Sequence, residues 1–286
     1  MGVLKKAAIP FLERSLGRPL HKPTVYFRVT PFCNLKCIIC DDWKPEKHKE
    51  RRLLENMLTK DEYIKIIDDL ADFGVQRLQF GGGEPLVRKE IFDIINYAKS
   101  KGLPTRILTN GYLLSKMDVA KKLSEGIDEV WVSLDGPNPE THDLERGVKG
   151  CFENVVKGIE NLNDIRFNGD RKFKIVVAAH ISPMNMFDPE EYLNLLQKLK
   201  ADSVLFTPVY SGHYGETLFN TGIKTAEDVR KVSEMVKRVK AVYCKSKIPI
   251  QTLFLSLNVA LEYYRNPAIL RKFKCYIGGY GLGFIE

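Results

Sequence analysis

Strand-like and helix-like segments alternate along most of this chain, and this alternation restricts the fold more than any other feature. Runs rich in β-branched and aromatic residues predict strands, and runs with apolar residues three and four positions apart predict helices. The predicted strands are Thr24–Val29, Gln76–Phe80, Pro104–Leu108, Glu129–Leu134, Lys174–His180 and Ser203–Pro208. The predicted helices are one from the Thr59 cap to Gly74, then Glu90–Lys101, Ser115–Glu125, Gly150–Leu162, Pro189–Leu199 and Thr225–Cys244. Six strand–helix units predict an α/β fold with a parallel, barrel-like sheet.

Polar or glycine-rich groups follow the predicted strands at the points where those strands end. These groups are Gly81–Glu84, Thr109–Gly111, Ser133–Gly136, His180–Ser182 and Tyr210–His213. The chemistry of a parallel barrel is found at the carboxyl ends of its strands. We therefore expect the functional site along this edge of the sheet.

Three cysteines, Cys33, Cys37 and Cys40, follow the first predicted strand with the spacing CxxxCxxC. Three thiolates on one short loop can bind three irons of a four-iron cluster and leave the fourth iron without a protein ligand. Zinc is the competing metal, but a closed zinc site requires a fourth ligand, and His48 is the only candidate nearby. A third interpretation is that these cysteines bind no metal.

The cysteine run closely resembles the cluster-binding loop of the radical S-adenosylmethionine (radical SAM) superfamily. The resemblance implies a partial (βα)6 TIM barrel and a [4Fe-4S] cluster whose open iron is chelated by the amino and carboxylate groups of SAM. It also implies an electron donor such as flavodoxin or ferredoxin, and reductive cleavage of SAM to a 5′-deoxyadenosyl radical. The family often has an aromatic residue near the adenine, directly before the third cysteine, where this chain has Ile39.

Gly82, Gly83 and Glu84 match the GGE motif of the same family. Consecutive glycines let a ligand reach backbone groups directly, although a tight turn alone would also use them. The resemblance implies that this backbone and the Glu84 carboxylate receive the methionyl ammonium of SAM. Asn110 lies in a turn that favours Asn and Gly, and it is a second-rank candidate for the SAM site.

Ser133 and Asp135 occupy alternate positions at the end of the fourth predicted strand, so we expect them to face the same side of the sheet. This segment resembles the fourth strand of radical SAM enzymes that carry a SPASM or twitch extension, in which the serine contacts SAM. Residues 141–147 resemble the HDxxRG stretch of those enzymes, which places Arg146 to bind the SAM carboxylate. The alternative for His142, Asp143 and Arg146 is a helix entry with surface salt bridges.

His180, Tyr210 and His213 are candidates to line the substrate cavity or to donate protons or hydrogen atoms. Structural roles are the alternative for each.

The net charge of +8, from 44 basic and 36 acidic residues, favours an anionic partner. The sequence lacks an aromatic–basic RNA-binding pattern, so no nucleic acid is expected. It also lacks a membrane-spanning run and a signal peptide, which predicts a cytoplasmic protein.

Three regions are predicted: residues 1–22, the barrel core at 23–247, and an extension at 248–286. The first is a basic amphipathic helix that either packs on the barrel or contacts a membrane surface. The extension contains Cys275 before a glycine-rich run, which resembles the start of a SPASM or twitch domain. One thiolate cannot hold a cluster, and the strand-like residues 284–286 are an unusual place for a chain to end, so we expect a truncated chain, with an auxiliary cluster only in a longer one. The alternative is a structural Cys275.

Together these features predict a radical SAM enzyme, and the resemblance to the SPASM group implies that it abstracts hydrogen from a peptide or from a cofactor or natural-product precursor. A second enzyme interpretation is modification of a lipid or isoprenoid at a membrane surface. The non-enzyme alternative is an iron-sulfur electron carrier, which has no use for the glycine-rich and Ser-Asp strand ends. Binding of SAM separates these classes.

Overall fold

The computed structural model describes residues 23–40, 43–44, 57–169, 171–208, 225–252, 257–258, 260–262 and 282–285. The helix predicted within residues 1–22 lies outside the described residues, and so do Tyr210, His213 and Cys275. None of the helices within the described ranges combines the length and the apolar character needed to cross a membrane.

A single parallel sheet forms the centre of the fold, with the strand order β6-β5-β4-β3-β2-β1-β7. Its strands are β1 (Thr24–Thr30), β2 (Arg77–Gly82), β3 (Thr105–Thr109), β4 (Glu129–Ser133), β5 (Lys174–Ile181), β6 (Ser203–Pro208) and β7 (Leu282–Ile285). The six predicted strands are confirmed, and the open α/β sheet agrees with a partial barrel. Strand β7 pairs with the outer edge of β1, an arrangement that the sequence did not predict.

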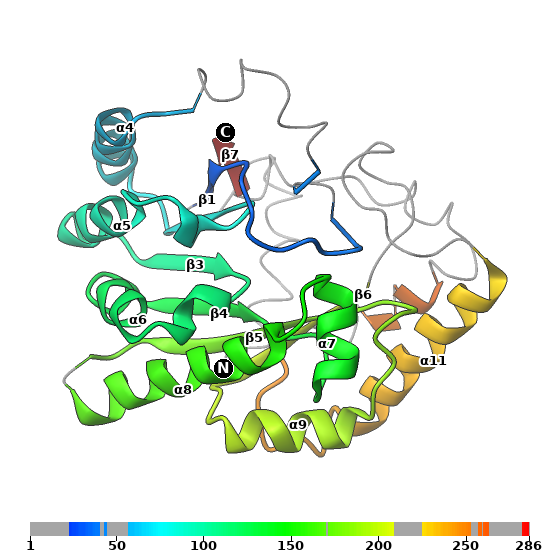
Figure 1. The fold of residues 1–286 in the computed structure, drawn as a ribbon. Helices are drawn as coiled ribbons and strands as arrows, with labels where there is room; N and C mark the ends of the chain where they lie inside the picture. Colours follow the sequence, from blue (N-terminus) through cyan, green and yellow to red (C-terminus); the bar gives the residue numbers. More distant parts are fainter. Residues whose placement is uncertain are drawn as a thin grey trace.

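Helices cover the outer face of this sheet (Figure 1). They are α4 (Lys60–Phe73), α5 (Ile91–Ser100), α6 (Met117–Ser124), α8 (Cys151–Asn168), α9 (Pro189–Lys198) and α11 (Ala226–Val242). Short 3-10 turns, η1 (Pro85–Val87) and η2 (Tyr112–Ser115), follow β2 and β3. Helix α4 begins at the predicted Thr59–Glu62 capping box and ends at Gly74, which has a φ of 74°.

One helix was missed by the sequence analysis. Helix α7 (Pro139–Arg146) lies beside the carboxyl ends of the strands, next to the loop that follows β1 (Figure 1). Its sequence is almost entirely polar, so it carries no apolar stripe for a periodicity argument to find. Asn138 caps it by accepting a hydrogen bond from the backbone N–H of Thr141 at 3.1 Å.

Successive side chains of each strand point to opposite faces of the sheet, one covered by helices and one facing the inside of the barrel. Val25 and Phe27 of β1 are buried on the helix-covered face, where the Phe27 ring lies 5.2 Å from Tyr63 and 5.7 Å from Phe80. On the inner face, Glu129 pairs with Arg77 at 3.1 Å and with Arg106 at 2.7 Å. These charged residues lie near the amino ends of their strands, so they close the end of the barrel opposite to the cysteine loop.

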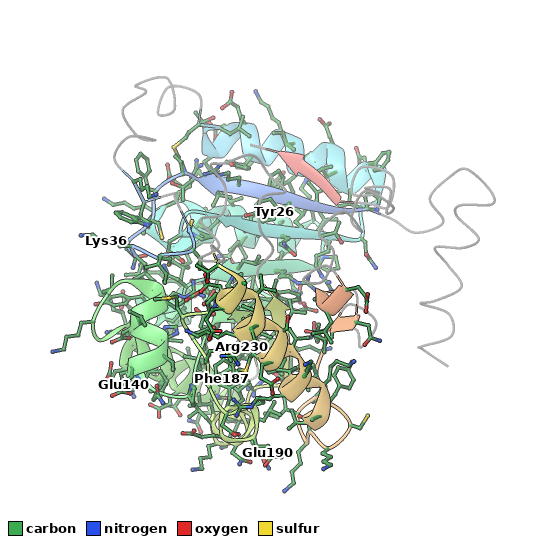
Figure 2. The ribbon with its side chains drawn as sticks, turned by 90° about the vertical axis from the view of Figure 1, so that its right-hand side faces the viewer. Tyr26, Lys36, Glu140, Phe187, Glu190 and Arg230 are labelled. Atoms are coloured by element: carbon green, nitrogen blue, oxygen red, sulfur yellow. The ribbon has the colours of Figure 1, made fainter. Side chains whose placement is uncertain are left out.

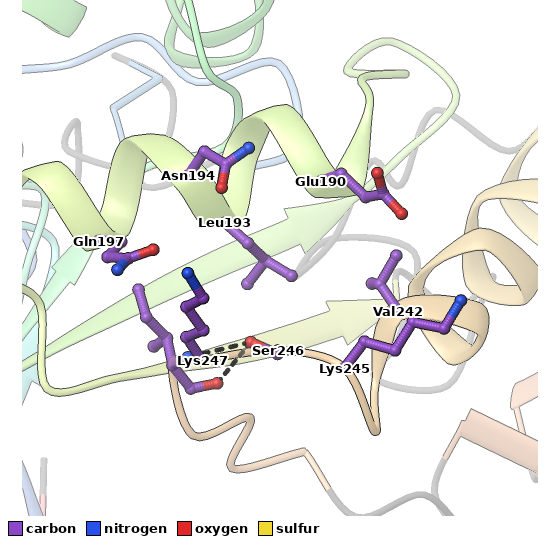
Figure 3. Close-up of a pocket in the computed structure, with 9 residues that line it drawn as sticks. Glu190, Leu193, Asn194, Gln197, Val242, Lys245, Ser246 and Lys247 are labelled. Atoms are coloured by element: carbon purple, nitrogen blue, oxygen red, sulfur yellow. Dashed lines mark hydrogen bonds between the residues drawn. The ribbon is translucent and has the colours of Figure 1, made fainter.

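Part of the predicted C-terminal extension packs on the edges of the sheet. Pro249 and Gln251 exchange backbone hydrogen bonds with Val204 of β6, at 3.0 and 2.7 Å. A shallow groove lies on the outside of the barrel between α9 and the turns after α11 (Figure 3). Its lining residues are Glu190, Leu193, Asn194, Gln197, Val242, Lys245, Ser246, Lys247 and Ile248. None of the predicted site residues lines this groove.

Candidate functional site

A cavity at the carboxyl ends of the strands contains the three motif cysteines. It is lined by Tyr26, Cys33, Leu35, Cys37, Ile39, Cys40, Trp43, Gly82, Gly83, Leu108, Thr109, Asn110, Ser133, Arg146 and His180. The structure thus brings most of the predicted cluster and SAM residues to one cavity, from segments more than a hundred residues apart. Figure 2 shows Lys36, on the loop that follows β1, at the left margin of the molecule, and Tyr26, on β1, to its right.

The cysteine sulfurs are partly or fully shielded from water. Burial raises the pKa of the Cys33 thiol to about 12, and burial also raises the pKa of Cys37. A raised pKa favours the protonated thiol. A bound cation favours the thiolate instead, because a thiol that coordinates a metal is deprotonated. Among the residues that the structure describes, no three His, Cys, Asp or Glu side chains converge as they would around a single metal ion. All three cysteines nevertheless line one cavity.

The glycine run after β2 lies directly against the start of the cysteine loop. Gly83 donates its N–H to the Thr30 carbonyl at 2.8 Å, and Glu84 donates to the Phe32 carbonyl at 2.7 Å. A Cβ added at Gly83 would lie 2.1 Å from the Phe32 carbonyl oxygen, so only glycine permits this approach. The run therefore leaves its backbone on the cavity wall and holds the cysteine loop in place.

The Glu84 carboxylate lies behind that wall and not on it. It is fully buried and accepts hydrogen bonds from Leu86 N at 3.0 Å, Thr109 Oγ1 at 2.7 Å and Asn110 N at 2.7 Å. Burial raises its pKa to about 7, and these bonds act in the opposite direction. In this geometry the carboxylate joins the loop after β2 to the end of β3.

Asp135 also lies behind the cavity wall. Strand β4 ends at Ser133, so strand alternation no longer places Asp135 beside it on the same face. Ser133 lines the cavity, whereas Asp135 is fully buried. Its Oδ2 accepts a hydrogen bond from Arg146 Nε at 2.6 Å, and its Oδ1 accepts one from the His180 backbone N–H at 2.9 Å. Burial raises the pKa of Asp135, but Arg146, His180 and His142 together outweigh it and hold the pKa below its usual value.

The HDxxRG stretch connects the end of β4 to the cysteine loop through α7. His142 Nδ1 accepts a hydrogen bond from the Asp135 backbone N–H at 3.0 Å. The Asp143 carboxylate accepts bonds from the backbone N–H groups of Gly150 at 2.7 Å and Phe152 at 2.8 Å, which caps the start of α8. Arg146 is almost fully buried against Asp135 and lines the cavity. Arg146 therefore makes a buried ion pair and not a surface one. Asp143 serves a helix entry, which is part of the alternative.

The last turn of α7 pairs with the cysteine loop through the backbone. Lys36 and Ile38 donate their N–H groups to the carbonyls of Arg146 at 3.2 Å and Glu145 at 3.0 Å. Gly147 ends the helix with a φ of 66°, and a Cβ there would lie 2.2 Å from the Lys36 carbonyl oxygen. Position 147 thus requires glycine for two reasons, the left-handed backbone and the close approach of the Lys36 carbonyl.

We expect Gly147→Ala to destabilise the protein more than Gly102→Ala. Both glycines have positive φ, 66° and 75°, but nothing lies within 4 Å of a Cβ at Gly102. The left-handed backbone costs alanine about 1–2 kcal/mol at either site. The clash with Lys36 adds about 1–3 kcal/mol at Gly147 alone. Urea unfolding measures both variants, and equal losses would contradict the contact between α7 and the cysteine loop.

Buried polar atoms without a hydrogen-bond partner gather around Asp135. Within the described residues six such side-chain atoms occur, and four of them are His142 Nε2, Glu145 Oε1, Arg146 Nη2 and His180 Nδ1. An unpaired buried polar atom costs about 1–3 kcal/mol, so a cluster of them indicates a missing ligand or water. Arg146 and His180 line the cavity, where their unpaired nitrogens suit a polar ligand bound beside the cysteines.

The sequence analysis did not identify Tyr26 and Trp43 of the cavity, nor the buried Glu145 of helix α7. Tyr26 lies on the same inner face as Gln79, its partner in the strand register, and strand alternation could have identified it. Trp43 donates its indole N–H to the Cys37 carbonyl at 2.9 Å and supplies an aromatic ring near Ile39. Buried Glu145 accepts a hydrogen bond from the Ser182 hydroxyl at 2.9 Å, and only the unpredicted helix α7 explains its position.

Of the three candidates for hydrogen or proton transfer, the described residues include His180 alone. Its side chain lines the cavity beyond the end of β4, beside Ser133. Burial lowers the pKa of its imidazole, although Asp135 acts in the opposite direction. Tyr210 and His213 lie outside the described residues, and their roles stay predictions.

Comparison with known proteins identifies relatives of this chain. The chain is 34% identical over 226 residues to Fe-coproporphyrin III synthase of Methanosarcina barkeri, covering 78% of this chain and 53% of that protein. It is 33% identical over 171 residues to mycofactocin maturase MftC of Mycolicibacterium smegmatis, covering 59% and 42%. The chain thus spans about half the length of the curated relatives that it matches.

Solved structures show the same fold. The crystal structure of Streptococcus suis SuiB bound to S-adenosylmethionine superposes with a TM-score of 0.67 and 17% identity, covering 99% of this chain and 62% of that one. The sequence profile of the radical SAM superfamily matches residues 27–196, more than half of this chain. The family uses a [4Fe-4S] cluster and SAM, and the three cysteines of one cavity, the glycine backbone and the unpaired nitrogens of Arg146 and His180 fit both groups. The chain therefore belongs to the radical SAM superfamily of enzymes.

Proposed function

We propose that Cys33, Cys37 and Cys40 hold a [4Fe-4S] cluster in this enzyme and leave one iron open to SAM. The observation that carries the proposal is the cavity that the three cysteines line together with Gly82, Gly83, Ser133 and Arg146. When bound and reduced, the cluster supplies the electron that splits a sulfur–carbon bond of SAM to give the 5′-deoxyadenosyl radical.

The chain's own residues would bind SAM and orient it. Gly82 and Gly83 offer backbone groups without side chains in the way, and Ser133 offers a hydroxyl at the end of β4. The unpaired Nη2 of Arg146 and Nδ1 of His180 are free to contact polar groups of SAM. Glu84 and Asp135 would act through their neighbours, by holding Asn110 and Arg146 in position. Such a fixed geometry is what directs a radical to one substrate hydrogen.

We infer that the substrate is a peptide or a cofactor or natural-product precursor. The curated relatives include Fe-coproporphyrin III synthase, an AdoMet-dependent heme synthase and mycofactocin maturase, and SuiB has been solved with its precursor peptide SuiA. The electron would come from a donor such as flavodoxin or ferredoxin. Because the relatives are enzymes, the electron-carrier alternative has no support, and nothing in the described residues favours the lipid or isoprenoid alternative.

Anaerobic reconstitution tests this proposal. The protein should bind about four irons per chain at the motif cysteines and, with dithionite and SAM, should release 5′-deoxyadenosine and methionine. The readouts are iron analysis, electron paramagnetic resonance of the reduced protein, and chromatography of the products. Full zinc occupancy without iron, or a four-iron protein that leaves SAM intact, would contradict it.

A further inference from the structure

Two side-chain N–H groups reach the sulfurs of the cysteine loop. Asn110 Nδ2 lies 3.8 Å from Cys33 Sγ, and Arg146 Nη1 lies 3.9 Å from Cys37 Sγ. One donor is a neutral amide from the end of β3, and the other is a permanently charged guanidinium from α7. The end of β3 and helix α7 thus approach two different cysteines of the same loop.

The Asn110 amide is held so that its nitrogen faces the cysteine loop. Its Oδ1 accepts a hydrogen bond from the Tyr112 backbone N–H at 3.0 Å, which settles which end of the amide is oxygen. One hydrogen of Nδ2 is donated to Asn34 Oδ1 at 2.8 Å, which leaves the other for Cys33. The backbone N–H of Asn110 is anchored on the buried Glu84 carboxylate at 2.7 Å, so the residue is fixed on three sides.

Arg146 is held with similar rigidity. Its Nε donates to Asp135 Oδ2 at 2.6 Å, and that carboxylate is itself held by the His180 backbone N–H. The guanidinium therefore cannot turn away from Cys37 without breaking a buried ion pair. Both donors are fixed before any ligand binds.

Hydrogen bonds and positive charge at cluster sulfurs raise the reduction potential of an iron-sulfur cluster. Reduction adds one electron, taken from an external low-potential donor, and forms or breaks no bond. The added negative charge is spread over the cluster and its thiolates, so an N–H donor stabilises the reduced state more than the oxidised state. The effect is strong where water is excluded, as it is around buried Cys37 and Asn110.

We propose that Asn110 and Arg146 set the reduction potential of the cluster through N–H contacts to Cys33 and Cys37. Asn110 is thereby more than a turn former, and Arg146 serves the cluster as well as SAM. This inference rests on the proposed function, since it requires a cluster on the three cysteines. Asn110 is the better residue to test, because replacing it leaves the buried Asp135–Arg146 pair intact.

The test is a redox titration of reconstituted protein, monitored by electron paramagnetic resonance. Asn110→Leu removes the donor and keeps water away from the sulfur. It should lower the reduced-to-oxidised ratio at a fixed potential about three- to tenfold, the effect of one hydrogen bond. Tenfold corresponds to about 59 mV for one electron. Asn110→Asp keeps an acceptor for the Tyr112 N–H but puts a negative charge beside Cys33, so its potential should fall further.

Asn34→Ala is the matched control. It removes the other acceptor of the same amide and leaves the Cys33 contact in place, so its potential should stay close to that of the wild type. Unchanged potentials in both Asn110 variants with full iron would overturn the inference, while a wild type that binds no iron would overturn the proposed function first. If neither Asn110 variant binds iron, electron–nuclear double resonance on the reduced wild-type protein tests the contact directly. An exchangeable proton coupled to 15N-labelled asparagine supports the contact, and its absence refutes it.

Discussion

Replacing Cys33, Cys37 and Cys40 together by alanine removes the bound iron and abolishes cleavage of SAM. The three sulfurs line the one cavity that also contains the Gly82–Gly83 backbone, and no alternative group of ligands occurs within the described ranges of the chain. Without thiolates the cluster has no protein ligands, so about four irons per chain should fall to background. Iron analysis, absorbance near 400 nm and the yield of 5′-deoxyadenosine measure the loss.

Cys244→Ala is the control for this experiment. Cys244 is exposed and lies outside the cavity, so its removal should change neither the iron content nor the yield. The assignment would be wrong if the triple variant kept its iron, or if Cys244→Ala lost as much iron as the triple variant. Single replacements should each reduce iron content as well, because a site with three protein ligands has none to spare.

Breaking the Asp135–Arg146 pair should give the largest loss of stability. Asp135 is fully buried, Arg146 is nearly so, and their atoms lie 2.6 Å apart. Asp135→Ala or Arg146→Ala leaves one uncompensated charge in the interior, which costs about 3–5 kcal/mol. Arg146→Ala also removes a donor from the cavity, so SAM affinity should fall about tenfold to a hundredfold. Urea unfolding and equilibrium binding of SAM measure the two effects.

Arg230→Ala is the matched control, because Arg230 makes a 2.6 Å ion pair with Glu227 on the exposed face of α11. A solvent-exposed pair contributes little, so this variant should unfold close to the wild type. The double variant Asp135→Ala/Arg146→Ala should lose less stability than the sum of the single losses, because the two charges are removed together. Additive losses would show that the pair is not coupled, against the geometry seen here.

Much of the barrel could be predicted from the sequence. The six core strands and six of the helices carry strong local signals, namely β-branched runs, apolar periodicity and caps such as the Thr59–Glu62 box. Helix α8 extends to Asn168, beyond the predicted end at Leu162, since helix ends depend on packing and capping that periodicity does not report. Strand β7 was not placed in the sheet because pairing with β1 is a contact between opposite ends of the chain.

The sequence alone determined which residues could carry the chemistry. The CxxxCxxC spacing, the glycine run and the strand-end polar groups are local patterns, and parallel topology brings strand ends to one edge. Their resemblance to the radical SAM family added the expected cofactors.

The tertiary structure decided which of those residues face the cavity and which stand behind it. Glu84 and Asp135 are buried in hydrogen bonds to Asn110 and Arg146, whereas Asn110 and Arg146 reach the sulfurs of Cys33 and Cys37. Which way these four side chains point depends on the residue at which each strand ends and on the position of helix α7, which carries Arg146. These are long-range contacts between segments far apart in the chain, so no local pattern encodes them.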